Sequence, residues 1–127
     1  MRVKFHSNII FKVIAYCLHA GGSCTSVAAD VVFILDESTS IVYNEGGYSN
    51  WYTDILGFAE NVTRTICSSQ TRVGVIKFSD STTVGFYLNN YTDCPSVINA
   101  ISQESIAGGE TNIAAALMQT RSLELIV

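Results

Sequence analysis

The stretch D-V-V-F-I-L-D-E-S-T-S, from Asp30 to Ser40, decides the fold of this chain. Residues 30–35 form a continuous apolar run rich in β-branched and aromatic side chains. Such a run is typical of a strand buried on both faces of a parallel sheet. A dense polar cluster, residues 36–40, follows directly, and ligands of open α/β sheets bind in loops at the carboxyl ends of strands. The stretch therefore predicts an α/β fold with a binding site immediately after this strand.

The residues that follow alternate between helical and strand patterns. Apolar side chains recur at helical spacing over residues 51–66, and Trp51 is expected in the core. Strands are predicted at 71–78 and 83–88, and the short turn between them implies an antiparallel hairpin at the sheet edge. The pattern then predicts a helix, a glycine-containing loop and a last helix rich in strong helix formers. These last elements occupy residues 93–101, 106–111 and 112–125.

Length and composition exclude several classes of protein. The 127 residues allow at most one domain, and 48% hydrophobic with only 14% charged residues excludes disorder and a coiled coil. Seven basic residues against eleven acidic ones leave no basic patch for nucleic acid. From Asp30 onward, four basic residues face all eleven acidic ones, so this part has a net charge of −7. Residues 1–29 contain three basic residues and no acidic one, so they belong to a different class of sequence from the rest of the chain.

The N-terminal segment has the order of a secretory signal. Two basic residues precede an apolar run, residues 9–20, and small residues follow it. This order predicts a signal peptide over residues 1–29, a secreted protein and a domain over residues 30–127. Lys12 and His19 interrupt the apolar run, so a signal anchor and an ordinary amphipathic N-terminus stay open. The run is shorter than the roughly 20 residues that span a bilayer, so no membrane span is predicted.

Cysteines and sequons fit an extracellular protein. Cys67 ends the first predicted helix and Cys94 opens the next, which makes this pair the disulfide candidate. Asn61, in N-V-T, and Asn90, in N-Y-T, would accept glycans in the secretory pathway. Asn90 is the better glycosylation candidate because it lies in a predicted loop, whereas Asn61 lies on a predicted helix.

Asp36, Ser38 and Ser40 form the pattern D-x-S-x-S directly after the buried strand. One carboxylate and two hydroxyl groups converge if the loop curls around a point. Such hard oxygen ligands suit Mg²⁺ or Mn²⁺, with Ca²⁺ as a further option, rather than zinc. Asp and Ser are also common in turns and at helix N-caps, so the pattern alone leaves both interpretations open. The flanking acids Glu37 and Glu110 are expected to be solvated loop residues.

Four segments together resemble the von Willebrand factor type A domain. They are D-V-V-F-I-L-D-E-S-T-S-I (30–41), T-R-V-G-V-I-K-F-S (71–79), L-N-N-Y-T-D (88–93) and G-G-E-T-N-I-A-A-A-L (108–117). The segments stand in the family's order and spacing. The resemblance implies a Rossmann-like α/β fold, an open sheet with helices on both faces, that carries a metal-ion-dependent adhesion site. Only the N-terminal part of the domain is expected in this chain, truncated after the third helix.

The resemblance also implies a set of metal ligands. Ser38 and Ser40 would bind the cation directly, Asp36 would act mostly through water, and Thr111 would add an oxygen from a second loop. A further aspartate, expected after the next apolar strand, would lie beyond Val127, so we expect this chain to bind the cation only weakly. A cation held mainly by neutral oxygens keeps an open position for a partner's Glu or Asp side chain. The expected partner is a collagen-like, matrix or cell-surface protein.

Three classes of function follow from these observations. The first is an adhesion or matrix-type binding module without enzymatic activity, since no nucleophile with an adjacent base is visible. The second is a phosphotransferase of the haloacid dehalogenase type, which would require an aspartate where this chain has Ser38. The third is a truncated isoform or gene fragment without independent activity.

Overall fold

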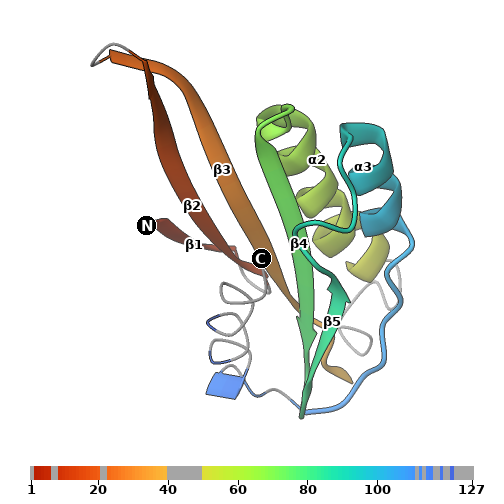
Figure 1. The fold of residues 1–127 in the computed structure, drawn as a ribbon. Coiled ribbons are helices and arrows are strands. Elements are labelled where there is room, and N and C mark those ends of the chain that lie inside the picture. Colours follow the sequence, from red (N-terminus) through yellow and green to blue (C-terminus); the bar gives the residue numbers. More distant parts are fainter. Residues whose placement is uncertain are drawn as a thin grey trace.

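A five-stranded mixed sheet with helices against one face forms the described part of the chain (Figure 1). The computed structural model describes residues 2–6, 9–20, 23–39, 50–110, 112, 114–115, 118 and 121. The strand order is β1-β2-β3-β4-β5. The strands are β1 (Arg2–His6), β2 (Ile9–Ala20), β3 (Ser23–Asp36), β4 (Thr71–Phe78) and β5 (Thr82–Phe86). The helices are the π-helical segment η1 (Asn50–Leu56), α2 (Gly57–Ile66) and α3 (Cys94–Ser102).

Strands β3 and β4 run parallel and form the centre of the predicted domain. Their register runs from Ala29 opposite Thr71 to Asp36 opposite Phe78. Parallel neighbours need a crossover connection, and η1 and α2 lie in that connection. The carboxyl ends of both strands therefore meet at the same end of the sheet. The predicted parallel arrangement and Rossmann-like α/β class are confirmed.

The predicted hairpin is also confirmed, because β5 pairs antiparallel with β4. Strand β5 ends at Phe86, two residues earlier than the sequence pattern predicts. Leu88 lies in a turn after the strand, yet its side chain is buried among the apolar residues of the sheet. The apolar pattern extends two residues beyond the strand because Leu88 packs inward from the turn, which is why the predicted strand was too long.

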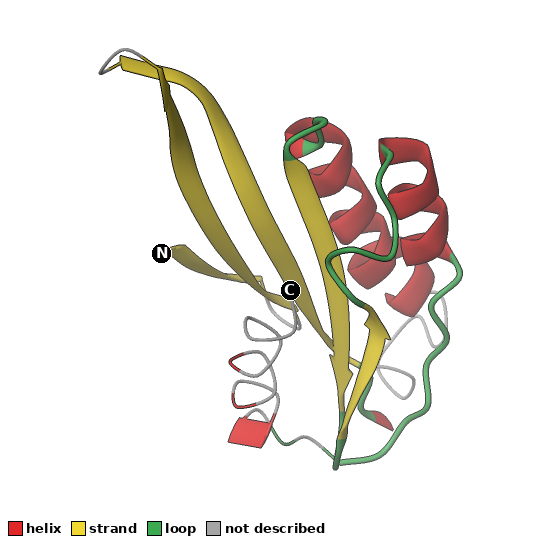
Figure 2. Cartoon of the chain, viewed as in Figure 1, coloured by secondary structure: helices red, strands yellow, loops and turns green. Residues whose placement is uncertain are grey.

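The main core lies between the sheet and the helices, which stand side by side on one face (Figure 2). The predicted helix over 51–66 is confirmed as one helical stretch formed by η1 and α2. Trp51 is fully buried, as expected from its place on the apolar stripe. The core contains side chains from β3, β4, β5 and the helices: Val31, Phe33, Leu35, Trp51, Ile55, Leu56, Ala59, Val73, Val75, Phe86, Val97 and Ile101.

A second apolar cluster lies on the opposite face of the sheet. It contains Val32 and Ile34 from β3, Ile76 and Phe78 from β4, and Leu88. Successive residues of a strand point to opposite faces, so β3 and β4 contribute to both clusters and are buried on both sides. This burial confirms the prediction made from their continuous apolar runs. Most of the predicted last helix, 112–125, lies outside the described residues.

Helix α3 begins with a side-chain cap and is tied to α2. The carboxylate of Asp93 accepts hydrogen bonds from Ser96 N at 2.9 Å and Ser96 Oγ at 2.8 Å. These bonds lower the pKa of Asp93, the backbone bond contributing most, because they favour the charged form. Cys67, directly after α2, and Cys94, the first residue of α3, form a disulfide. The two helices are therefore joined covalently at one end.

The N-terminal residues form an antiparallel hairpin on the outer side of β3 (Figure 1). Strand β2 pairs with β3 from Ile9 opposite Leu35 to Ala20 opposite Ser23. The segment 1–29 that is predicted as a signal peptide thus includes β1, β2 and the first part of β3, and its cleavage stays a prediction. Within the described residues, no helix combines the length and apolar character needed to cross a membrane.

Candidate metal centre

Two loops meet at the carboxyl ends of β3 and β4. The first begins at Asp36 and is described as far as Thr39, and the second covers residues 104–110. Gly108 N donates to the Glu37 carbonyl at 3.0 Å, and Thr39 N donates to the Gly109 carbonyl at 2.8 Å. In return, Gly109 N donates to Thr39 Oγ1 at 2.7 Å. The structure therefore brings the D-x-S-x-S loop against the G-G-E-T loop.

Two of the four predicted ligands lie within the described residues. Asp36 is 7% exposed and Ser38 is 1% exposed, at the start of the first loop. Ser38 N donates to Asp36 Oδ1 at 2.9 Å, which closes a local turn of the kind Asp favours. Ser40 and Thr111 lie outside the described residues. Their place in the ligand set stays a prediction.

Glu37 is buried, which corrects the expectation that it is a solvated loop acid. Its side chain is only 2% exposed. Glu37 Oε1 accepts a hydrogen bond from Thr83 Oγ1 at 3.2 Å, and Oε2 accepts one from Ala107 N at 3.0 Å. This burial was not predictable from the local pattern, because the partners of Glu37 come from β5 and from the second loop. Glu110, the other flanking acid, is exposed as expected.

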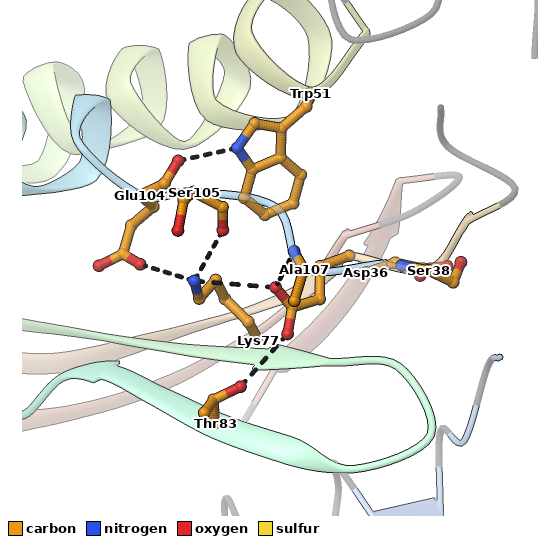
Figure 3. A network of polar contacts seen from close by, with 9 residues as sticks. Asp36, Ser38, Trp51, Lys77, Thr83, Glu104, Ser105 and Ala107 are labelled. Atoms are coloured by element: carbon orange, nitrogen blue, oxygen red, sulfur yellow. Dashed lines mark hydrogen bonds and ion pairs between the residues drawn. The ribbon is translucent and has the colours of Figure 1, made fainter. Parts of the chain in front are cut away.

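Lys77 of β4 lies beside Glu37 and belongs to the same polar network (Figure 3). Its Nζ is 3.7 Å from Glu37 Oε2 and 3.3 Å from Glu104 Oε2. It also donates to the carbonyl of Ser105 at 2.7 Å. The indole N–H of Trp51 donates to the carbonyl of Glu104 at 2.8 Å, which links the network to the main core.

A third segment, the turn after β4, also contacts the second loop. Asp80 Oδ1 accepts a hydrogen bond from Glu110 N, and the carbonyl of Ser79 accepts one from Asn112 N at 2.8 Å. Neither Asp80 nor Thr39 was among the predicted site residues. A usable signal was present, since polar residues that follow neighbouring parallel strands meet at the same end of the sheet.

The second loop requires glycine at two successive positions. Gly108 and Gly109 have backbone φ angles of +82° and +118°, which residues other than glycine rarely adopt. A Cβ atom at Gly109 would also collide with the carboxylate of Asp80. The pair G-G in this motif is thus explained by backbone geometry and by the close approach of Asp80.

The candidate metal ligands within the described residues suit a hard cation. They are a carboxylate and a hydroxyl group, on Asp36 and Ser38, and oxygen ligands of this kind suit Mg²⁺, Mn²⁺ and Ca²⁺. Within the part of the chain that the structure describes, no three His, Cys, Asp or Glu residues gather as a metal-binding group. A site here would therefore depend on hydroxyl oxygens, which leaves a bound cation strongly attractive to an anion.

Comparison with known proteins gives a consistent result. The family model of the von Willebrand factor type A domain matches residues 30–124. The human collagen alpha-6(VI) chain is 33% identical over 88 residues, which is 69% of this chain and 4% of that protein. Human vitrin is 29% identical over 71% of this chain and 13% of its own length. The transmembrane cell adhesion receptor mua-3 of Caenorhabditis elegans is 33% identical over 75% of this chain and 2% of its own.

Solved structures share the fold. Proximal thread matrix protein 1 from the mussel byssus has a TM-score of 0.64 at 23% identity, over 72% of this chain and 23% of that one. Another structure of the same mussel protein, described as having a zinc-occupied MIDAS motif, has a TM-score of 0.62 at 22% identity, over 72% of this chain and 24% of that one. The chain thus spans a small part of the curated relatives and about a quarter of the mussel protein.

Proposed function

Because this chain belongs to the von Willebrand factor type A family, we propose that it is an extracellular adhesion or matrix-type binding module. Its relatives include collagen VI chains, and another relative, mua-3, is a cell adhesion receptor by name. The proposed activity is binding rather than catalysis. The proposed location is outside the cell, after removal of a signal peptide over residues 1–29.

The proposed binding site is a metal-ion-dependent adhesion site. Ser38 and Ser40 would hold the cation directly, Asp36 would act mostly through water, and Thr111 would supply an oxygen from the second loop. When bound, the cation supplies an electrophilic centre that attracts an anion. The expected cation is Mg²⁺ or Mn²⁺, with Ca²⁺ as a further option. The mussel protein, whose MIDAS motif holds zinc, makes Zn²⁺ a cation to include in the test.

The single observation that carries this proposal is the contact between the two ligand loops. Thr39 and Gly109 exchange hydrogen bonds at 2.8 and 2.7 Å, so the loop with Ser38 lies against the loop that leads to Thr111. Few carboxylates are available in the ligand set, so a bound cation would keep most of its charge. A Glu or Asp side chain of a collagen-like, matrix or cell-surface partner would then complete its coordination.

The first test is cation binding by the purified 127-residue chain. Mn²⁺ is titrated by water-proton relaxation, with Mg²⁺, Ca²⁺ and Zn²⁺ as competitors. We expect weak but measurable Mn²⁺ binding that Asp36→Ala and Ser38→Ala abolish. Asp54→Ala is the matched control, because Asp54 is an exposed carboxylate that belongs to neither loop and accepts a hydrogen bond from its neighbour Thr53. Equal Mn²⁺ affinity in the native chain and Asp36→Ala would refute the proposed site.

The second test is partner binding. Native chain and Asp36→Ala are applied to immobilised collagen and to an acidic peptide surface, with Mg²⁺ or with EDTA. We expect retention of the native chain only with Mg²⁺ and no retention of the variant. Binding that persists in EDTA would contradict a metal-dependent mechanism.

Absence of both cation and partner binding would support the alternative of a fragment without independent activity. Hydrolysis of an aryl phosphate would support the phosphotransferase alternative.

Secretion is tested separately. Both proposed glycan acceptors, Asn61 and Asn90, are exposed. Asn90 lies just after a turn and its Oδ1 accepts from Tyr87 N at 2.7 Å, whereas Asn61 lies on α2. Expression in a secreting cell line, followed by N-terminal sequencing and glycosidase treatment, would identify the mature start and the modified residue. We expect a start near residue 30 and a glycan on Asn90. Retention inside the cell with residues 1–29 attached would contradict the proposed signal peptide.

A further inference from the structure

The side chain of Glu37 turns into the protein although its neighbours Asp36 and Ser38 belong to the proposed ligand set. A carboxylate that is 2% exposed is costly to bury unless its oxygens are hydrogen-bonded and its charge is paired. Glu37 meets both conditions. Thr83 Oγ1 donates to one oxygen at 3.2 Å and Ala107 N donates to the other at 3.0 Å.

Lys77 supplies the compensating charge and extends the network to the second loop. Its side chain is 11% exposed, and its Nζ lies between Glu37 Oε2 at 3.7 Å and Glu104 Oε2 at 3.3 Å. Its bond to the Ser105 carbonyl at 2.7 Å adds a backbone contact in the same loop. Figure 3 shows Lys77 below the second loop, which contains Glu104, Ser105 and Ala107. One ammonium group therefore holds β4 against the loop that leads to the proposed metal centre.

Glu37 contacts the second loop through its backbone as well. The amides of two successive residues end on it, Ala107 N on its carboxylate and Gly108 N on its carbonyl. The next amide, Gly109 N, ends on Thr39. Thr111 follows two residues later in the sequence. Residue 37 thus fixes the register in which the second loop approaches the first.

We infer that Glu37 and Lys77 are positioning residues, which set the distance between the two loops without contacting the cation. The consequence for the cation rests on the proposed function, but the loop geometry does not. A glutamate inside D-x-S-x-S would then be part of how this chain builds its site. Residues that hydrogen-bond directly to metal ligands typically change metal affinity by roughly 10- to 100-fold when they are replaced, and we expect the lower end of that range for Glu37, which acts through the loops.

The inference is tested first by amide hydrogen exchange in the full 127-residue chain. Glu37→Leu removes the acceptor for Ala107 N–H and the charge that faces Lys77. We expect exchange at Ala107 and Gly108 to accelerate by about fivefold to tenfold, while amides in the middle of β4 keep their native rates. Glu37→Gln keeps the shape and an acceptor oxygen, so it should restore most of the protection. Uniform acceleration across the sheet would reduce Glu37 to a general stabilising role and overturn the inference.

Asp30→Asn is the matched control for the charge change. Asp30 of β3 and Arg72 of β4 form a bidentate ion pair, with N–O distances of 2.7 and 2.6 Å. This pair lies near the amino end of β4, whereas Glu37 and Lys77 lie near its carboxyl end. This variant should lower stability without changing exchange at Ala107 and Gly108. If Glu37→Leu does not fold, Lys77→Gln provides the same comparison, because it removes the ammonium group and keeps a hydrogen-bond donor for Ser105. Faster loop exchange in Asp30→Asn would contradict the inference.

The second arm measures Mn²⁺ affinity in the same variants. We expect Glu37→Leu to weaken Mn²⁺ binding by about tenfold or more and Glu37→Gln to weaken it much less. Unchanged affinity in Glu37→Leu, with normal Mn²⁺ binding by the native chain, would refute the positioning role. Absence of Mn²⁺ binding by the native chain would instead refute the proposed function, and the exchange arm would still decide whether Glu37 positions the loop.

Discussion

Thr39 and Gly109 exchange two hydrogen bonds across the candidate metal centre, although they are seventy positions apart. Thr39 N donates to the Gly109 carbonyl at 2.8 Å, and Gly109 N donates to Thr39 Oγ1 at 2.7 Å. The second bond needs a side-chain hydroxyl group at residue 39, since Thr39 Oγ1 is the acceptor. The middle residue of S-T-S, which the ligand pattern leaves unassigned, therefore joins the two loops that the pattern describes.

Replacing Gly109 with alanine should destabilise this contact. The φ angle of +118° is strained for alanine, and the new Cβ would collide with Asp80, so we expect a loss of about 1–3 kcal/mol in unfolding free energy. Gly57→Ala is the control. Its Cβ would meet only Tyr52 O, at an ordinary 3.5 Å within a helix, so this change should stabilise by about 0.5–1 kcal/mol. Urea denaturation of both variants measures the difference, and a loss from both would contradict the argument.

Gly85→Ala should act through Glu104. An added Cβ at residue 85 would lie 2.6 Å from Glu104 Oε1, so it displaces the carboxylate that pairs with Lys77. We expect Gly85→Ala alone to lower the free energy of unfolding by about 1–2 kcal/mol. In a Glu104→Ala background, Gly85→Ala should have little further effect because the colliding atoms are gone. A double-mutant cycle measures this coupling, and additive losses would show that Gly85 matters for another reason.

Reduction of the Cys67–Cys94 disulfide should destabilise the chain without changing the site. The bond closes a loop with a sequence separation of 27, for which the chain-entropy relation gives about 3–4 kcal/mol. A Cys67→Ala/Cys94→Ala variant should therefore unfold at lower urea concentration. Amide exchange at Gly108 and Gly109 serves as the control, since the disulfide lies near the amino end of β4 and these glycines lie near its carboxyl end. Unchanged urea stability would contradict this account.

The Asp93 cap should make α3 sensitive to acid. Folding lowers the pKa of Asp93 through its bonds to Ser96, so its stabilising effect is fully present above the ordinary value of 3.8. That effect is lost as the pH falls through the lowered folded pKa. Asp93→Asn removes the titration, so the difference in melting temperature between native chain and variant should shrink on acidification. A constant difference from pH 7 to pH 2 would argue against the cap.

Much of the fold was predictable from local sequence patterns. The second predicted strand, 71–78, coincides with β4, and the helical periodicity over 51–66 matches η1 and α2. These elements have regular apolar repeats, which report directly on which side chains face the core. The end of β5 was less predictable because Leu88 is buried from a turn rather than from a strand.

The candidate site was predictable in its loops but not in its internal contacts. The sequence by itself determined the strand–loop pattern around Asp36 and the glycine pair at 108 and 109, because these are local properties of the backbone and of residue type. Only the tertiary structure decided that Glu37 is buried with Lys77 and that Thr39 bonds to Gly109. Those outcomes depend on chain segments up to seventy residues apart, brought together when β3 and β4 pair in parallel. A local pattern shows which groups a loop carries, but the partners that decide their burial and direction come from the rest of the fold.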